Sequence, residues 1–109
     1  MKNEHDLAYD RLCREDIAKD TARFLSIEYD KVIEHLDRHD PAEADKLKAD
    51  NETLNFKELK NKDFRSFTDD QLTEFLKNFG QHSRHFHEIG YEIAKEQFAD
   101  RWSVTNGKN

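Results

Sequence analysis

The chain has few of the residues that build disulfide frameworks, tight turns or membrane spans. Its 109 residues include one cysteine, one proline and three glycines, and no apolar run is longer than three residues. The single cysteine, Cys13, cannot form an internal disulfide, and the charged start lacks the apolar segment of a secretion signal. We therefore expect a cytoplasmic protein without a membrane anchor.

The composition favours helix over sheet. Glu, Asp, Lys, Leu and Ala are abundant, whereas Val and Thr are few, and the scarcity of glycine and proline leaves little turn chemistry for hairpins. Hydrophobic residues make up 35% and charged residues 39% of the chain, against roughly 45–50% and 25% in typical domains. We expect one all-α domain spanning residues 1–109, a small bundle with a modest core. Such a chain gains stability from a partner or from forming a homodimer.

The second half of the chain predicts one long helix, from about residue 69 to residue 102. Thr68 and Gln71 have the spacing of a capping box, and Phe67 and Leu72 that of a hydrophobic staple. An apolar series then recurs every seven residues: Leu72, Phe79, Phe86 and Ile93. One side of this helix must therefore pack against an apolar surface.

Two glycines within this predicted helix, and the residues that follow it, need separate consideration. Gly80 could end the helix, but the apolar series keeps its phase across it, so we expect one helix that bends there at most. Gly90 falls on the apolar side, where the missing side chain would allow a neighbouring helix to approach closely. Residues 103–109 are expected to form a flexible tail.

A second long helix is predicted over about residues 16–38. Its apolar residues step by three and four: Ala18, Ala22, Leu25, Tyr29, Val32 and Leu36. Extended backwards, this seam meets the polar residues Arg11 and Glu15. We therefore expect a break near residues 14–16, preceded by a short helix over about residues 4–13.

Short helices are predicted to link the two long ones. Asp40-Pro41 can cap and begin a helix over about residues 41–49, because proline suits the first helical position. Asp50-Asn51 has the composition of a turn. Phe56 and Leu59 then form one further apolar pair at helical spacing.

The charge opposes general binding to nucleic acids. The net charge is −6, and 11 of the 24 acids lie within residues 1–40. A local basic group, Lys57, Lys60, Lys62 and Arg65, leaves a sequence-specific nucleic-acid-binding regulator as an alternative.

Six histidines raise the question of a metal site. His35 and His39 are four residues apart, which suits two ligands on one helical face. A site made of His35, His39, His82 and Glu88 would require the two long helices to pack antiparallel. In the other interpretation His82 lies at the core boundary and the remaining histidines are solvated. We expect no cofactor, and keep a histidine-based metal sensor or enzyme as an alternative.

The sequence carries no catalytic motif: it has no glycine-rich phosphate loop, no Gly-x-Ser-x-Gly and no Cys-x-x-Cys. Phe98, Arg101 and Trp102 fall near the chain end, beyond the reach of a neighbouring helix of about 22 residues, and are the candidates for binding a partner. We expect a non-enzymatic protein that binds another protein stoichiometrically, as inhibitors, immunity proteins and regulators do, including those encoded by phages. A basic target such as a nuclease would suit its acidic surface.

Overall fold

The computed structural model describes the backbone of residues 4–106 and the side chains of residues 8–99. This part of the chain is helical and contains no strand, which confirms the predicted all-α fold. The elements are α1 (Glu4–His39), α2 (Pro41–Leu54), two 3-10 turns, η1 (Phe56–Asn61) and η2 (Phe64–Ser66), and α3 (Asp69–Asn106). None of these helices is long and apolar enough to cross a lipid bilayer.

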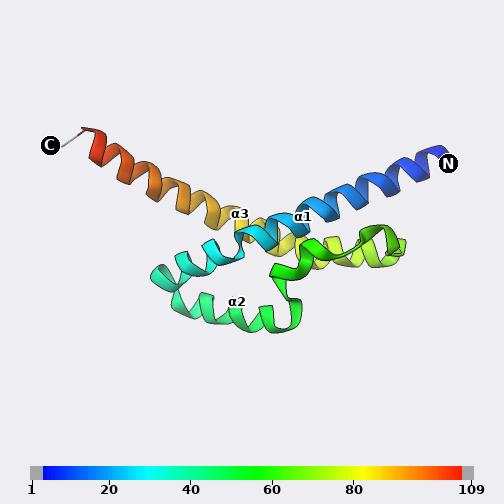
Figure 1. Cartoon of the computed structure of the whole chain (residues 1–109), viewed down its shortest axis with the longest axis horizontal. Coiled ribbons are helices and arrows are strands. Elements are labelled where there is room, and N and C mark those ends of the chain that lie inside the picture. The colour runs from blue at the N-terminus through cyan, green and yellow to red at the C-terminus, as the bar shows by residue number, and fades with distance from the viewer. Residues whose placement is uncertain (1–3, 107–109) are drawn as a thin grey trace.

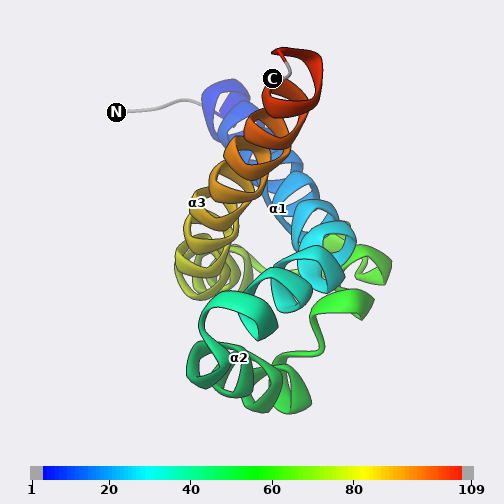
Figure 2. The ribbon, with the colours of Figure 1, turned by 90° about the vertical axis from the view of Figure 1, so that its left-hand side faces the viewer.

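The two long helices cross where they pack together, and both run from the right to the left of Figure 1. Near the start of both, Arg11 of α1 bonds to Asp69 of α3 at 2.7 Å. At the end of α1, His39 lies 2.7 Å from Glu96 of α3. The chain between α1 and α3 leads from the end of α1 back towards its start. α2 runs beneath the two long helices, and η1 and η2 then pack along α1 (Figure 2). This long return is what makes α1 and α3 parallel.

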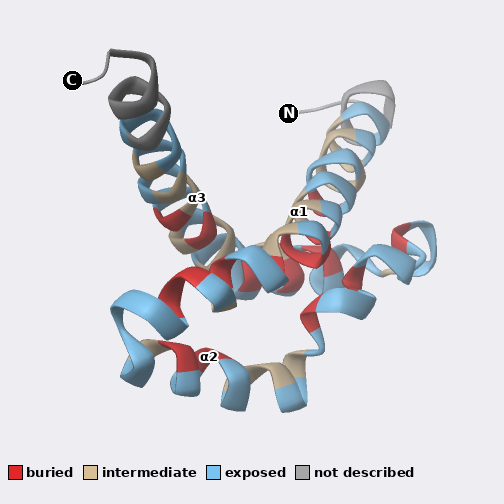
Figure 3. Ribbon diagram, turned by 60° about the vertical axis from the view of Figure 1, so that its left-hand side comes forward, coloured by how far each residue is buried: buried red, intermediate tan, exposed pale blue. Residues whose placement is uncertain are grey.

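The core lies where these elements meet. All six residues of the seam predicted between positions 18 and 36 are buried, and so are Leu72, Phe75, Phe79, Phe86 and Ile89 of α3. Phe56 of η1 is fully buried and contacts the rings of Tyr29, Phe79 and Phe86. Figure 3 shows these buried positions gathered on the facing sides of the helices, with exposed residues on the outer sides.

The predicted break near residues 14–16 is wrong, because α1 is one continuous helix. Arg11 and Glu15, the polar residues that suggested a break, form ion pairs and hydrogen bonds from their places in the continuous helix. Arg11 pairs with Glu15 one turn later at 2.7 Å and also bonds to Asp69 and the carbonyl of Phe67. An arginine at this seam position therefore joins α1 to the start of α3, and no apolar residue is needed there.

The first linking helix begins as predicted but ends later. Asp40 caps α2 through a bond from the backbone N–H of Glu43 to its carboxylate. The turn expected at residues 50–51 is wrong: α2 continues to Leu54, and Asn55 reverses the chain with a φ of 52°. Asn51 contributes to this reversal, since its side-chain oxygen accepts a bond from the N–H of Phe56 at 2.7 Å.

The capping box before α3 is confirmed. The N–H of Thr68 bonds to the side chain of Gln71 at 2.8 Å, and the N–H of Gln71 bonds back to the Thr68 hydroxyl at 3.1 Å. The helix runs through Gly80 without interruption. The close helix approach expected at Gly90 is wrong, because a Cβ added there would meet nothing within 4 Å.

Both long helices extend beyond the region where they pack together. The molecule measures 64 × 31 × 22 Å, and its two ends are formed by the start of α1 and the end of α3 (Figure 1). We call residues 97–106 of α3, which follow its contact with the last residue of α1, the C-terminal extension. Its helical backbone includes residues 103–106, so the flexible tail expected there is wrong for these four residues, and residues 107–109 lie outside the described part.

Candidate functional site

Two histidines and two acids meet where α1 ends against α3. His35 and His39 are one turn apart on α1, and their ring centroids are separated by 4.4 Å. Glu92 and Glu96 are one turn apart on α3 and face them. Both pairs are offset by the same 57 positions, because the two helices run in the same direction here. We call these four residues the His-Glu cluster.

His35 is the buried centre of the His-Glu cluster. Its side chain is 3% exposed, and its Nε2 lies 3.3 Å from Oε1 of Glu92, within hydrogen-bond distance. Its Nδ1 is also inaccessible and has no hydrogen-bond partner among the described residues. The nearest charged oxygen to Nδ1 is Oε1 of Glu96, at 3.7 Å.

The outer part of the His-Glu cluster is open to solvent. Nε2 of His39 lies 2.7 Å from Oε2 of Glu96, and these side chains are 48% and 39% exposed. Arg38 also approaches Glu96, with 4.0 Å between its Nη2 and Oε1. One nitrogen from each histidine and one oxygen of Glu96 lie within 4.8 Å of one another, a separation that one metal ion could span.

The other two metal-ligand candidates from the sequence lie elsewhere. His82 packs its ring against Phe56 and Phe79, with centroids 5.2 and 6.2 Å away, as expected of a residue at the core boundary. Burial lowers the pKa of His82. Glu88 is exposed and belongs to no potential metal-binding group among the described side chains. Because the helices are parallel, His35 and His39 face Glu92 and Glu96 instead.

Sequence reasoning missed Glu96 for the same reason. Helical spacing alone places Glu92 and Glu96 on one face, but an antiparallel arrangement would have brought earlier residues of α3 to the end of α1. The missing information was the direction of the return through α2, which depends on tertiary packing and not on a local pattern.

A second feature is a set of aromatic residues towards the end of α3. Tyr91 and Phe98 are 68% and 67% exposed and lie seven residues apart, hence on one helical face. Trp102 follows Phe98 by four residues in the same helical backbone. Arg101 also lies on the C-terminal extension, but the side chains of Arg101 and Trp102 lie outside the described part. We call Tyr91, Phe98 and Trp102 the aromatic stripe.

α1 also presents large apolar side chains to solvent. Tyr9, Leu12 and Ile17 are 66%, 58% and 54% exposed, close to the exposed acids Asp16 and Asp20. The helical spacing of Tyr9 and Leu12 indicates a helix but not which of its faces is exposed, and Ile17 lies outside the predicted seam. The three residues form a second set of exposed apolar side chains, on α1.

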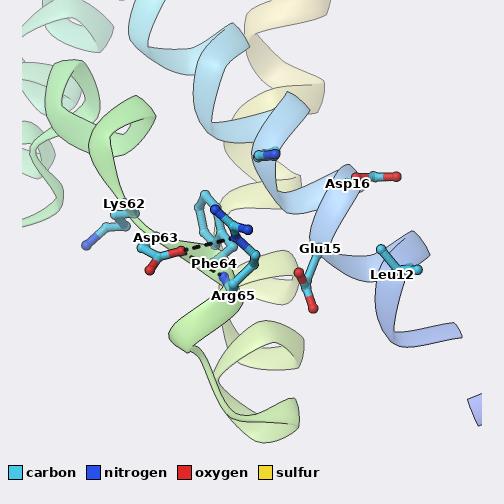
Figure 4. Close-up of a pocket in the computed structure, with 8 residues that line it drawn as sticks. Leu12, Glu15, Asp16, Lys62, Asp63, Phe64 and Arg65 are labelled. Carbon is cyan, nitrogen blue, oxygen red and sulfur yellow. Dashed lines mark hydrogen bonds and ion pairs between the residues drawn. The ribbon is translucent and has the colours of Figure 1, made fainter. Parts of the chain in front are cut away.

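A pocket lies between α1 and the segment that joins η1 to η2 (Figure 4). This pocket has a volume of about 450 Å³, and acidic residues such as Glu15 and Asp63 alternate on its wall with basic ones such as Lys62 and Arg65. Its described lining contains no histidine, serine or cysteine. The pocket therefore presents charges of both signs without an arrangement suited to nucleophilic catalysis.

The basic group named from the sequence is partly neutralised. Lys57 forms an ion pair with Asp30 at 3.0 Å, and Arg65 lies 4.0 Å from Asp63. Paired cations attract a phosphate backbone less strongly than free ones, so the structure adds no support for nucleic-acid binding at this position.

Comparison with known proteins gives no relative: no protein-family model matches the chain, and neither curated proteins nor solved structures include a significant match.

Proposed function

We propose that this protein acts by stoichiometric binding to another protein, with the aromatic stripe of α3 as the centre of the contact. The observation that carries the proposal is the exposure of Tyr91 and Phe98 on a helix that continues ten residues past Glu96. Large aromatic side chains are strongly favoured at the centres of interfaces, because they bury much area with little loss of conformational freedom.

The geometry suits one helix docking in a groove. Residues 91, 98 and 102 follow the spacing by which an amphipathic helix presents anchors to a partner. The stripe lies away from the core face of α3, where Phe86 and Ile89 are buried. Partner binding would therefore leave the intramolecular packing unchanged.

The charge supports a basic partner. The chain carries a net charge of −6, with the excess acid concentrated in its first 40 residues. Opposite charge on a partner would accelerate association and orient it, although it would add less to the affinity. A nuclease or another protein that handles nucleic acids carries the required positive surface, so we propose an inhibitor or regulator of such a target.

Quantitative affinity capture tests this proposal. The chain is immobilised and exposed to a lysate of its source cells, and captured proteins are quantified for the native chain and for Phe98→Ala and Trp102→Ala. Ile27→Ala is the matched control, because Ile27 is 53% exposed but lies in the middle of α1. If these residues are hot spots, each of the two substitutions weakens binding by about 30-fold or more.

The outcome is decided by stoichiometry and by the control. A protein recovered at one copy per chain, lost in the two aromatic variants and retained by Ile27→Ala, supports the proposal. Equal recovery by all variants would remove the stripe from the contact. A concentration-dependent doubling of mass that disappears with Phe98→Ala would instead identify a homodimer as the occupant.

A further inference from the structure

We infer that the His-Glu cluster is a binding site for one divalent transition-metal ion, with His35, His39 and Glu96 as ligands and Glu92 as the residue that orients His35. This site is independent of the proposed partner contact. It follows from a buried imidazole nitrogen without a partner and from the three groups that converge on the same point.

His35 has a buried ring nitrogen that lacks a hydrogen-bond partner among the described residues. With its Nε2–H donated to Glu92, its Nδ1 carries a lone pair in a position that no solvent reaches. That lone pair faces a carboxylate oxygen of Glu96 at 3.7 Å. A buried lone pair that faces a carboxylate oxygen is stabilised by a positive group between the two atoms, either a proton or a metal ion.

The position of His39 favours a metal ion over a proton. Nε2 of His39 lies 2.7 Å from the other oxygen of Glu96, so a second imidazole nitrogen converges on the same carboxylate. A proton on His35 would satisfy Nδ1 and leave His39 paired with Glu96 alone. A metal ion would bind both nitrogens and the carboxylate together, and zinc is bound by three protein ligands with water in the fourth position in many proteins.

The separations between the candidate ligand atoms can be compared with those around a zinc ion. Ligand atoms around a tetrahedral zinc ion lie about 3.3 Å apart, given bonds of 2.0–2.1 Å. Nδ1 of His35 lies 3.7 Å from Oε1 of Glu96 and Nε2 of His39 lies 2.7 Å from Oε2 of Glu96, and one ligand atom from each residue lies within 4.8 Å of the others. His39 and Glu96 are 48% and 39% exposed, so their side chains can rotate to bring the three ligand atoms around one ion.

Glu92 holds the ring of His35 in place. Histidines that bind metals donate their other N–H to a carboxylate or carbonyl, which fixes the tautomer and the ring orientation. The 3.3 Å contact from Nε2 of His35 to Glu92 has this form. Two imidazoles with one carboxylate select zinc, nickel or cobalt over magnesium and calcium, which prefer oxygen ligands.

Zinc titration of the full-length untagged protein, treated first with a chelator and then dialysed, tests the site. We expect one saturable site per chain by calorimetry, a cobalt complex with visible absorption, and a rise in Tm on adding zinc. His39→Gln and Glu96→Gln should each lower zinc affinity by about 100-fold. Glu92→Gln should lower it by about 10-fold to 100-fold.

Matched substitutions on the same molecule give the controls. His85→Gln removes a partly exposed histidine that faces Glu43, and Glu88→Gln removes an exposed acid one turn from Glu92. Both should leave the zinc affinity unchanged. Circular dichroism of each variant at equal concentration checks that helicity is retained.

Three results would overturn the inference. One is the absence of saturable zinc binding by the native chain. Another is zinc binding that His39→Gln and Glu96→Gln leave intact. The last is an equal loss in His85→Gln, which would indicate nonspecific binding by surface histidines. In each case the His-Glu cluster is an ion-pair network only.

Discussion

At the scale of single residues, a few polar side chains hold the elements together. Ser26 is 8% exposed and joins α1 to η1: its hydroxyl donates to the carbonyl of Phe56 at 2.7 Å and accepts from the N–H of Lys60 at 3.0 Å. Arg11 does the same between α1 and the start of α3. Neither role is visible in the sequence, since each depends on a contact between residues more than 30 positions apart.

Replacement of Ser26 tests the first of these contacts. Ser26→Ala leaves the carbonyl of Phe56 and the N–H of Lys60 without their partner, so the free energy of unfolding should fall by about 1–3 kcal/mol. Urea denaturation measures it. Ser66→Ala is the control: its hydroxyl bond to Asp63 is exposed, and its removal should change stability by less than about 0.5 kcal/mol. Equal effects would contradict the proposed anchor.

His82 predicts a loss of stability in mild acid. Burial lowers the pKa of His82 below the ordinary value of 6.5, the nearby Asp50 carboxylate opposes this, and His85 adds to it. The unfolded chain therefore binds the proton more readily than the folded one. As the pH falls through 6.5 towards the lower folded value, the free energy of unfolding should decrease.

Urea denaturation at several pH values from about 7.5 to about 5 measures this contribution. His82→Gln should make the decline shallower, because the residue no longer titrates. His87→Gln, at an exposed position that stacks on Phe24, should retain the native slope. An identical slope in the His82 variant would show that other groups cause the acid dependence.

At the scale of elements, sequence patterns correctly predicted the features that depend on residues close together in the chain. The capping box at Thr68 and Gln71, the seam from Ala18 to Leu36 and the start of α2 at Pro41 all follow from spacing, and all are confirmed. The continuity of α1 could not be predicted, because the bonds that satisfy Arg11 come from residues 67 and 69.

Gly80 offers a test of the continuity of α3. It lies in the middle of the helix, is exposed, and a Cβ added there would meet nothing within 4 Å. Gly80→Ala should therefore raise the free energy of unfolding by about 0.5–1 kcal/mol, because alanine loses less conformational entropy in a helix. Chemical denaturation measures the change. A clear loss of stability would show that the glycine serves a bend or a contact.

At the scale of the whole molecule, the path of the segment that connects α1 to α3 decides where the candidate sites lie. Because α2, η1 and η2 together lead back along α1, α3 starts beside Arg11 and passes His39 at Glu96. This places the His-Glu cluster at the end of α1 and leaves the C-terminal extension beyond it. The partner role of Phe98, Arg101 and Trp102 stays a prediction from sequence position, whereas the composition of the His-Glu cluster required the tertiary arrangement.

The central claim is that the start of α1 and the end of α3 project from a small core, with Tyr91 and Phe98 largely exposed on α3. Small-angle X-ray scattering of the dilute chain, with its mass measured in parallel, tests this most directly. The structure predicts a radius of gyration near 18.0 Å for the single chain. A compact chain of this length would give about 13 Å. A value near that lower figure would mean that the ends fold back on the core and would contradict the account.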